Sequence, residues 1–171
     1  MPSSRLAIGL VLVASTSGAS SISLDAPGAD PALIAFSITH RGLRRSTEFA
    51  SEAGLEYRSA ERLWVLKPFG GVMANSAGTV YVFAGLLLDI YLGEHFVLTP
   101  SSAPGFYYAG QGKDLGFPLE FRSQVEVSYR FWNGSRVGIG VNHLSNAKLG
   151  RINPGIEAVS ITFSTPGVFG R

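Results

Sequence analysis

The 171-residue sequence predicts an all-β fold, an eight-stranded antiparallel transmembrane β-barrel. Apolar and polar residues alternate with period two from residue 32 onward, which is typical of β-strands with two different faces. Most predicted strands have about ten residues, the length of a tilted strand that crosses a bilayer and more than is usual in soluble sheets. The connections alternate between tight turns and longer loops, as they do in outer-membrane barrels.

The clearest strand runs through residues 119–131, where the two faces have opposite chemistry. One parity is apolar, with Leu119, Phe121, Val125, Val127, Tyr129 and Phe131. The other parity is polar, with Glu120, Arg122, Gln124, Glu126, Ser128 and Arg130. The remaining predicted strands are 32–40, 47–57, 63–74, 80–92, 95–109, 136–146 and 155–164.

The connections and the prolines test this assignment. Tight turns are predicted at 58–62, 93–94 and 132–135, and longer loops at 40–46, 110–118 and 147–154; the connection 75–79 breaks the alternation. Pro68, Pro100 and Pro104 interrupt predicted strands, although proline is normally confined to edge strands or bulges. Because a closed barrel has no edge strand, we expect bulges at these positions.

Alternation alone leaves open which face points inward. A soluble lipocalin-like barrel has an apolar interior, whereas a membrane barrel has a polar interior and an apolar outer wall. The strand lengths, the loop asymmetry, the charged fraction of 15% and the N-terminal signal described below favour the membrane barrel. On this interpretation charged side chains fill the lumen, namely Glu48, Glu52, Glu56, Lys67, Asp89, Glu120, Arg122, Glu126 and Arg130.

The first 19 residues have the features of an export signal. Met1–Arg5 carries a positive charge, Leu6–Ala14 is an apolar run too short to span a bilayer, and Ser17-Gly18-Ala19 provides small residues for cleavage. A buried N-terminal strand or helix is the alternative. We therefore expect a signal peptide at 1–19 and a single barrel domain at 20–171.

Composition excludes several classes of function. The net charge is only +2, so we expect no nucleic-acid partner, which would need clustered Lys and Arg residues. The absence of cysteine excludes disulfides, thiolate metal sites and cysteine nucleophiles. His40 and His95 lie at strand ends without a second ligand nearby, so no metal and no cofactor are expected.

The segment "VNHLSNAKLGRINPGIE" places polar residues on an apolar parity. His143 and Ser145 continue the parity of the apolar residues before them, and Glu157 does the same on the next strand. If the loop is symmetric about Gly150, His143 lies opposite Glu157 in the antiparallel ladder. A serine, a histidine and a carboxylate are the parts of a hydrolytic triad, although a His-x-Ser pair at a strand end can also simply cap a loop.

The sequence motif of this segment, "HLSNA" followed by "NPGIE", resembles that of the outer-membrane lipid A 3-O-deacylases, the PagL-type family. The resemblance implies a serine esterase with Ser145 as nucleophile, His143 as general base and Glu157 as the carboxylate that orients it. It also implies that Asn146 and the backbone N–H of Ala147 help to stabilise the oxyanion, although strict alternation turns Asn146 toward the lumen.

The same resemblance implies lipid A, or lipopolysaccharide, as substrate among outer-membrane lipids, with the active site toward the outer leaflet. Arg41, Arg44 and Arg45 lie in a loop at the same end, but Lys148 and Arg151 share the triad's own loop and are the better candidates for binding its phosphates. These loop cations can also be merely solvated. Two other functions remain open: a non-enzymatic barrel with a structural or adhesion role, and a soluble barrel that binds a lipid inside.

The family resemblance also implies an aromatic residue at the end of the last strand. Here Phe163 is followed by "STPGVFGR", so either this tail tucks beneath the barrel or Phe169 takes the terminal role.

Overall fold

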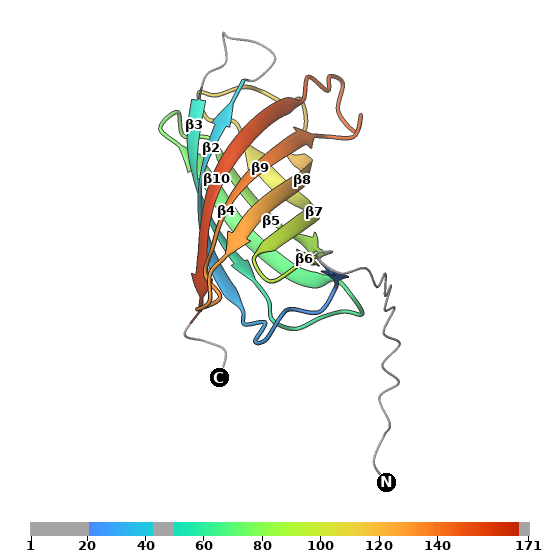
Figure 1. The fold of residues 1–171 in the computed structure, drawn as a ribbon. Helices are drawn as coiled ribbons and strands as arrows, with labels where there is room; N and C mark the ends of the chain where they lie inside the picture. Colours follow the sequence, from blue (N-terminus) through green and yellow to red (C-terminus); the bar gives the residue numbers. More distant parts are fainter. Residues whose placement is uncertain (1–20, 43–49, 168–171) are drawn as a thin grey trace.

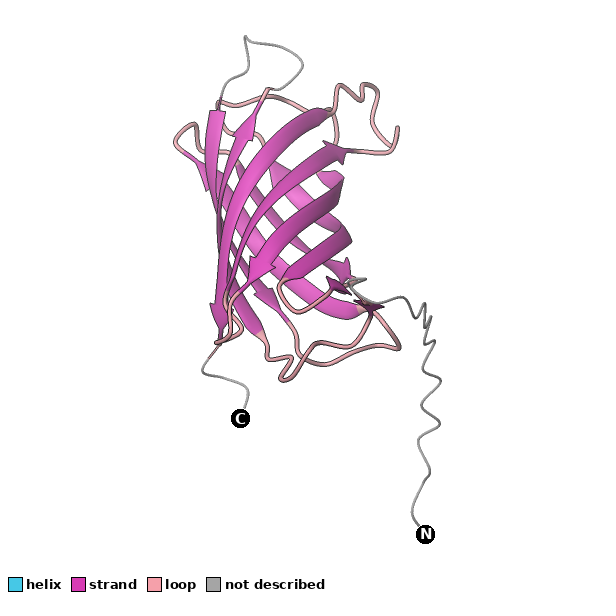
Figure 2. Ribbon diagram, viewed as in Figure 1, coloured by secondary structure: helices cyan, strands magenta, loops and turns pink. Residues whose placement is uncertain are grey.

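The computed structural model describes residues 21–42 and 50–167, and within them it contains strands, turns and loops (Figures 1 and 2). The strands are β1 (Ile22–Ser23), β2 (Leu33–Arg41), β3 (Ala50–Arg58), β4 (Lys67–Asn75), β5 (Val80–Leu87), β6 (Ile90–Leu92), β7 (Phe96–Tyr108), β8 (Leu119–Arg130), β9 (Arg136–Ser145) and β10 (Ile156–Pro166). No helix among the described residues is long and apolar enough to span a membrane.

The sheet closes on itself. Strands β2 to β5 pair in sequence, β5 pairs with β7, β7 to β10 continue the series, and β10 returns to β2. Both β5 and β6 pair with β7, so they are two halves of one wall strand, and β1 adds a short pairing to β6. The wall therefore has eight antiparallel strands without a free edge, which confirms the predicted fold class.

The outer wall is apolar, whereas the interior contains many buried charged side chains beside a cluster of apolar ones that includes Phe69, Phe83 and Leu87. On β8, Val125 and Val127 are 45% and 49% exposed, whereas Glu120 and Glu126 are 0% and 1% exposed. Phe36, Ile38, Ile139 and Ile161 are likewise exposed on the outer faces of their strands. The soluble barrel with an apolar interior is therefore wrong, because this wall matches a lipid environment.

The lumen is filled by ion pairs. Arg58 donates two hydrogen bonds to Glu126, at 3.0 and 2.9 Å, and Arg122 donates one to Glu56 at 2.6 Å. Arg136 and Lys67 surround Asp89, with donor to acceptor distances of 3.0 to 3.2 Å. The predicted network is thus confirmed for Glu52, Glu56, Lys67, Asp89, Arg122 and Glu126.

For three predicted members of this network and one predicted loop cation, the structure does not bear out the sequence-based expectation. Glu120 and Arg130 are buried in the lumen but form no ion pair with a described residue, and Glu48 lies outside the described residues. Arg41, predicted as a cation of the loop, is buried and pairs with Glu52 inside the barrel. Its place at the end of β2, on the lumenal parity, explains the difference.

The N-terminal segment, residues 24–31, crosses the lower mouth of the barrel in Figure 1. The Asp30 carboxylate accepts hydrogen bonds from Lys67 at 2.6 Å, Arg62 at 2.8 Å and Tyr91 at 3.0 Å. Burial acts to raise the pKa of Asp30, but these donors and cations outweigh it and hold the pKa below its ordinary value. The segment is therefore tied to the wall by a charged carboxylate.

The prolines fit the closed sheet because their missing N–H groups face gaps in the pairing. Pro68 lies beyond the end of the β3–β4 ladder, where its carbonyl still accepts from Ser59. Pro100 faces the interruption between β5 and β6, and Pro104 lies where the β5–β7 register skips from Phe83 to Leu86. Breaks in one neighbouring ladder thus take the place of the expected bulges.

Two boundaries differ from the sequence-based expectation. The strand predicted at 63–74 begins only at Lys67, because Leu63 and Leu66 bridge to each other around Trp64, whose φ is 63°. The last strand continues through Ser164 and Thr165 to Pro166, so the start of the tail is ordered in the sheet. The predicted signal peptide, Arg44, Arg45 and Phe169 lie outside the described residues.

Candidate active site

The triad residues lie where β9 ends and β10 begins, at the upper end of the barrel in Figure 1. The loops 76–79, 109–118 and 146–155 lie at this end, and the connections 59–66, 93–95 and 131–135 lie at the other. Among the described residues the two longest connections, 109–118 and 146–155, are at the triad end. Longer loops at the triad end are the asymmetry that marks the outer side of an outer-membrane barrel. All three triad side chains belong to the outward-facing parity of their strands.

The predicted register between the two strands is confirmed. His143 pairs with Glu157 across the β9–β10 ladder. The Nδ1 atom of His143 lies 3.6 Å from Oε1 of Glu157, an ion-pair distance that is longer than a hydrogen bond. The side chains are 50% and 33% exposed, so the pair sits on the outer wall and not in a sealed pocket.

Gly155 makes room for the imidazole ring. It directly precedes Ile156, which pairs with Leu144 at the end of the β9–β10 ladder, and a Cβ atom built on Gly155 would lie 3.0 Å from Cε1 and 3.6 Å from Nε2 of His143. Gly155 also has a φ of +59°, and its carbonyl accepts a hydrogen bond from Lys113 Nζ at 3.0 Å. The ring edge that carries Cε1 and Nε2 therefore lies against Gly155, while Nδ1 lies nearest to Glu157.

Ser145 is the last residue of β9 and is partly buried. Its side chain forms no hydrogen bond with the described residues, so the serine and the imidazole of His143 are neighbours on one strand without being bonded in this state. Catalytic hydrogen bonds are often long before substrate binds and tighten in the complex. The arrangement thus brings the three residue types of a triad onto one outer face, with His143 opposite Glu157 and Ser145 two residues further along β9.

A second serine, Ser123, lies directly opposite His143 on β8. Ser123 in turn pairs with Ser102 on β7, so a polar row crosses the outer wall from Glu157 through His143 to these two serines. This row was not among the features predicted from the sequence. The signal was present, because Ser123 interrupts the apolar parity between Phe121 and Val125.

Asn146 faces the lumen and is 0% exposed. Its amide nitrogen donates to the carbonyls of Leu115 at 2.7 Å and Ile152 at 2.8 Å, and its amide oxygen accepts from the backbone N–H of Lys148 at 2.9 Å. Its own backbone N–H donates to Asn153 Oδ1 at 3.2 Å. Both donor groups of Asn146 are therefore hydrogen-bonded within this end of the barrel, and its predicted part in stabilising the oxyanion stays a prediction.

Replacing Asn146 with alanine should destabilise this end of the barrel. The carbonyls of Leu115 and Ile152 would lose their donor, and each unsatisfied buried group costs about 1 to 3 kcal/mol. Asn142→Ala is the matched control, because Asn142 lies four residues earlier, in β9, and its Nδ2 has no hydrogen-bond partner among the described residues. Thermal unfolding in detergent should show a lower midpoint for Asn146→Ala than for Asn142→Ala; equal midpoints would contradict the supporting role.

The loop after Ser145 adopts an uncommon backbone. Ala147 and Lys148 both have positive φ values, 52° and 66°, a conformation that residues other than glycine rarely adopt. No described residue accepts a hydrogen bond from the Ala147 N–H. The side chains of Lys148 and Arg151 are exposed and form no ion pair with the described residues. These two cations and the free N–H group thus lie in the loop that directly follows the serine.

Comparison with known proteins identifies the family of the chain. The sequence profile of the family described as lipid A 3-O-deacylase (PagL) matches residues 66–166, more than half of the chain. The chain belongs to the PagL family. The matched range includes His143, Ser145 and Glu157, together with the strands from β4 to β10.

Individual relatives agree with the family assignment. The lipid A deacylase PagL of Pseudomonas aeruginosa is 37% identical over 54 residues, which are 32% of this chain and 31% of that protein. The match thus spans about a third of the curated relative.

Solved structures agree at the level of the fold. The crystal structure of the outer membrane enzyme PagL matches with a TM-score of 0.60 at 20% identity, covering 79% of this chain and 99% of that one. A de novo designed transmembrane β-barrel matches with a TM-score of 0.52 at 13% identity, covering 80% and 94%. Both likenesses concern the fold. With the family and the apolar wall, they identify the chain as an outer-membrane β-barrel, as the sequence predicted.

Proposed function

We propose that this PagL-family chain is a lipid A 3-O-deacylase that works as a serine esterase on the outer surface of its barrel. The observation that carries the proposal is the pairing of His143 with Glu157 on the lipid-facing wall, with Ser145 on the same face of β9. A triad on an apolar outer wall suits a substrate that never leaves the membrane. Lipid A is such a substrate, because its acyl chains lie in the bilayer.

The proposed reaction uses the two ring nitrogens of His143 differently. Glu157 faces Nδ1 and holds the proton on that nitrogen, which leaves the Nε2 lone pair for the hydroxyl of Ser145. Ser145 Oγ attacks the ester carbonyl carbon while Nε2 takes the hydroxyl proton. The tetrahedral intermediate collapses as His143 returns this proton to the sugar oxygen, and water then hydrolyses the acyl-enzyme by the same route.

The N–H group of Ala147 is the proposed oxyanion donor. It belongs to the residue two positions after Ser145 and has no acceptor among the described residues, in contrast to the N–H of Lys148, which Asn146 occupies. A preorganised donor of this kind stabilises the charge that develops on the carbonyl oxygen. The hydrogen bonds of Asn146 contribute indirectly by fixing the left-handed backbone of the loop.

The outer wall beside Ser145 offers a surface for acyl chains. Ser145 pairs across the ladder with Phe121, and the outward-facing residues below His143 are Val141 and Ile139, which are 56% and 62% exposed. An acyl chain lying along this wall brings its ester group to the height of the triad. The phosphates of lipid A then lie at headgroup height, near Lys148 and Arg151, which we place toward the outer leaflet.

Replacing Lys148 and Arg151 together with glutamine should raise the KM for phosphorylated lipid A more than the KM for a dephosphorylated analogue. Exposed ion pairs contribute at most about 1 kcal/mol each, so we expect a change of up to roughly thirtyfold. Steady-state kinetics on both substrates measures the effect. Equal changes for the two substrates would show that these residues do not recognise the phosphates.

The proposed function is tested directly with purified protein. Folded protein in detergent is mixed with lipid A, and the released fatty acids and the residual lipid are identified by mass spectrometry. We expect release of a 3-hydroxyacyl chain from an ester at the 3-position, with the amide-linked chains retained. A folded barrel that releases no fatty acid would favour the alternative, in which the chain has a structural or adhesion role.

A further inference from the structure

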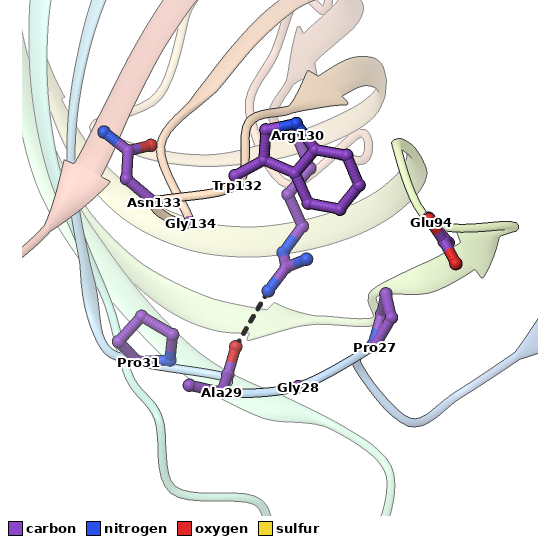
Figure 3. Close-up of a pocket in the computed structure, with 9 residues that line it drawn as sticks. All are labelled: Pro27, Gly28, Ala29, Pro31, Glu94, Arg130, Trp132, Asn133 and Gly134. Carbon is purple, nitrogen blue, oxygen red and sulfur yellow. Dashed lines mark hydrogen bonds between the residues drawn. The ribbon is translucent and has the colours of Figure 1, made fainter.

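A second site lies at the opposite end of the barrel. A cavity of about 360 Å³ opens between the N-terminal segment and the β8–β9 turn (Figure 3). Arg130 and Trp132 line it from the turn side, Pro27 and Ala29 line it from the N-terminal segment, and Glu94 lines it from the turn before β7. None of these residues belongs to the triad or to its loop.

Arg130 differs from the other buried arginines. Arg41, Arg58, Arg122 and Arg136 each pair with a lumenal carboxylate. Arg130 is only 8% exposed, yet its side chain donates only to the carbonyl of Ala29, at 3.0 Å, and pairs with no carboxylate among the described residues. A buried charge without a counterion is costly, so an anion bound beside this guanidinium would stabilise it. In Figure 3 it points into the cavity.

The cavity lies at the level of a membrane interface. Phe96, Tyr129, Phe131 and Trp132 are 51%, 39%, 43% and 81% exposed at this end of the barrel. His95 stacks on Tyr129 and meets Trp132 edge to face, with ring centroids 5.2 and 4.5 Å apart. Aromatic girdles of this kind lie at the headgroups of a bilayer. Phosphates of lipid headgroups are therefore the anions nearest to Arg130.

Glu94 places a second requirement on the ligand of this cavity. It is exposed on the rim of the same cavity, and it does not form an ion pair with Arg130. A ligand that spans the two residues needs a negative group for Arg130 and a positive group for Glu94. We propose that this cavity binds a zwitterionic phospholipid headgroup of the phosphoethanolamine type, with its phosphate on Arg130, its ammonium on Glu94 and its glycerol end beside Trp132.

The chain supplies its own reporter for this site. Its two tryptophans are Trp132 and Trp64, and Trp64 is 86% exposed in the β3–β4 turn. In a Trp64→Phe background, fluorescence reports on Trp132 alone. The protein is purified in a sugar-based detergent, which carries no phosphate, and titrated with dihexanoyl phosphatidylethanolamine, dihexanoyl phosphatidylglycerol, O-phosphoethanolamine and inorganic phosphate.

We expect a saturable change with phosphatidylethanolamine at the lowest concentration, and weaker responses to phosphatidylglycerol and inorganic phosphate. Arg130→Gln should weaken binding at least about tenfold, because it removes the charged donor. Glu94→Gln should abolish the preference for phosphatidylethanolamine over phosphatidylglycerol, whereas Glu61→Gln, which removes an exposed acid from the neighbouring turn, should not.

The variants distinguish a loss of lipid binding at this cavity from misfolding and from a loss of deacylation. Glu94 is exposed, so its replacement tests the proposal even if Arg130→Gln fails to fold. Deacylation should be unchanged in both variants, because the cavity is remote from Ser145. No saturable response, undiminished binding by folded Arg130→Gln, or a loss of preference in Glu61→Gln as large as in Glu94→Gln would overturn the proposal. Inorganic phosphate or soluble O-phosphoethanolamine binding as tightly as the phospholipid would overturn the assignment to a lipid.

Discussion

Ser145→Ala should lower the kcat for lipid A deacylation by at least about a thousandfold, because removing the nucleophile of a triad leaves only binding and oxyanion stabilisation. His143→Ala should have a similar effect, since the base and the nucleophile act as a unit. Glu157→Ala should retain more activity, because Glu157 only orients the imidazole and lies 3.6 Å from it. None of these side chains fills the lumen, so the barrel should fold in each variant.

Ser123→Ala is the matched control for this prediction. Ser123 is the serine that lies directly across the ladder from His143, and it has the same chemistry as Ser145 on the same outer wall. We expect Ser123→Ala to keep most of the activity, because the edge of the His143 ring that carries Cε1 and Nε2 lies against Gly155, just before β10, whereas Ser123 lies on β8, on the other side of β9. If folded Ser145→Ala hydrolysed lipid A at the wild-type rate and Ser123→Ala did not, the nucleophile would be Ser123.

Gly155→Ala should reduce kcat by at least about tenfold, because a displacement of about 1 Å in a catalytic group can cost a hundredfold and a smaller displacement costs less. The new Cβ atom would lie 3.0 Å from Cε1 of His143, so the imidazole must shift by a few tenths of an ångström. Alanine at a φ of +59° also strains the backbone, by roughly 1 kcal/mol or more. Steady-state kinetics, with folding monitored by thermal unfolding, measures both effects.

Gly78→Ala distinguishes the two possible causes of a lower kcat, which are contact of the new Cβ atom with His143 and strain of the backbone. Gly78 lies in the β4–β5 loop at the same end of the barrel, has a φ of +75°, and has open space around its Cα. The substitution therefore strains the backbone without touching a side chain of the site. We expect Gly78→Ala to lower thermal stability while leaving kcat near the wild-type value. An equal loss of kcat in both variants would show that backbone strain, and not contact with His143, causes the loss.

Much of this fold could be predicted because the wall repeats one simple rule. Side chains alternate between lipid and lumen, so the parity of residues 119–131 already separates the two faces. The same rule places His143 and Glu157 on one face, and the length of their loop sets the register. Parity and register together bring the triad together without any knowledge of distant contacts.

The features that could not be predicted depend on contacts between distant segments. Nothing near Asp30 in the sequence indicates that it accepts hydrogen bonds from Arg62, Lys67 and Tyr91. The isolated charge of Arg130 likewise becomes visible only when the partners of the other lumenal arginines are known. The space that Gly155 leaves for His143 depends on ring orientation, which parity does not specify.

The lipid A of cells that produce the chain tests the central claim most directly. A strain without a deacylase of its own produces either the wild-type chain or the Ser145→Ala variant, and mass spectrometry compares its lipid A. With both proteins folded in the outer membrane, the account predicts loss of one ester-linked 3-hydroxyacyl chain in the wild-type cells and none in the variant. Unmodified lipid A in cells whose outer membrane contains the folded wild-type barrel would contradict it.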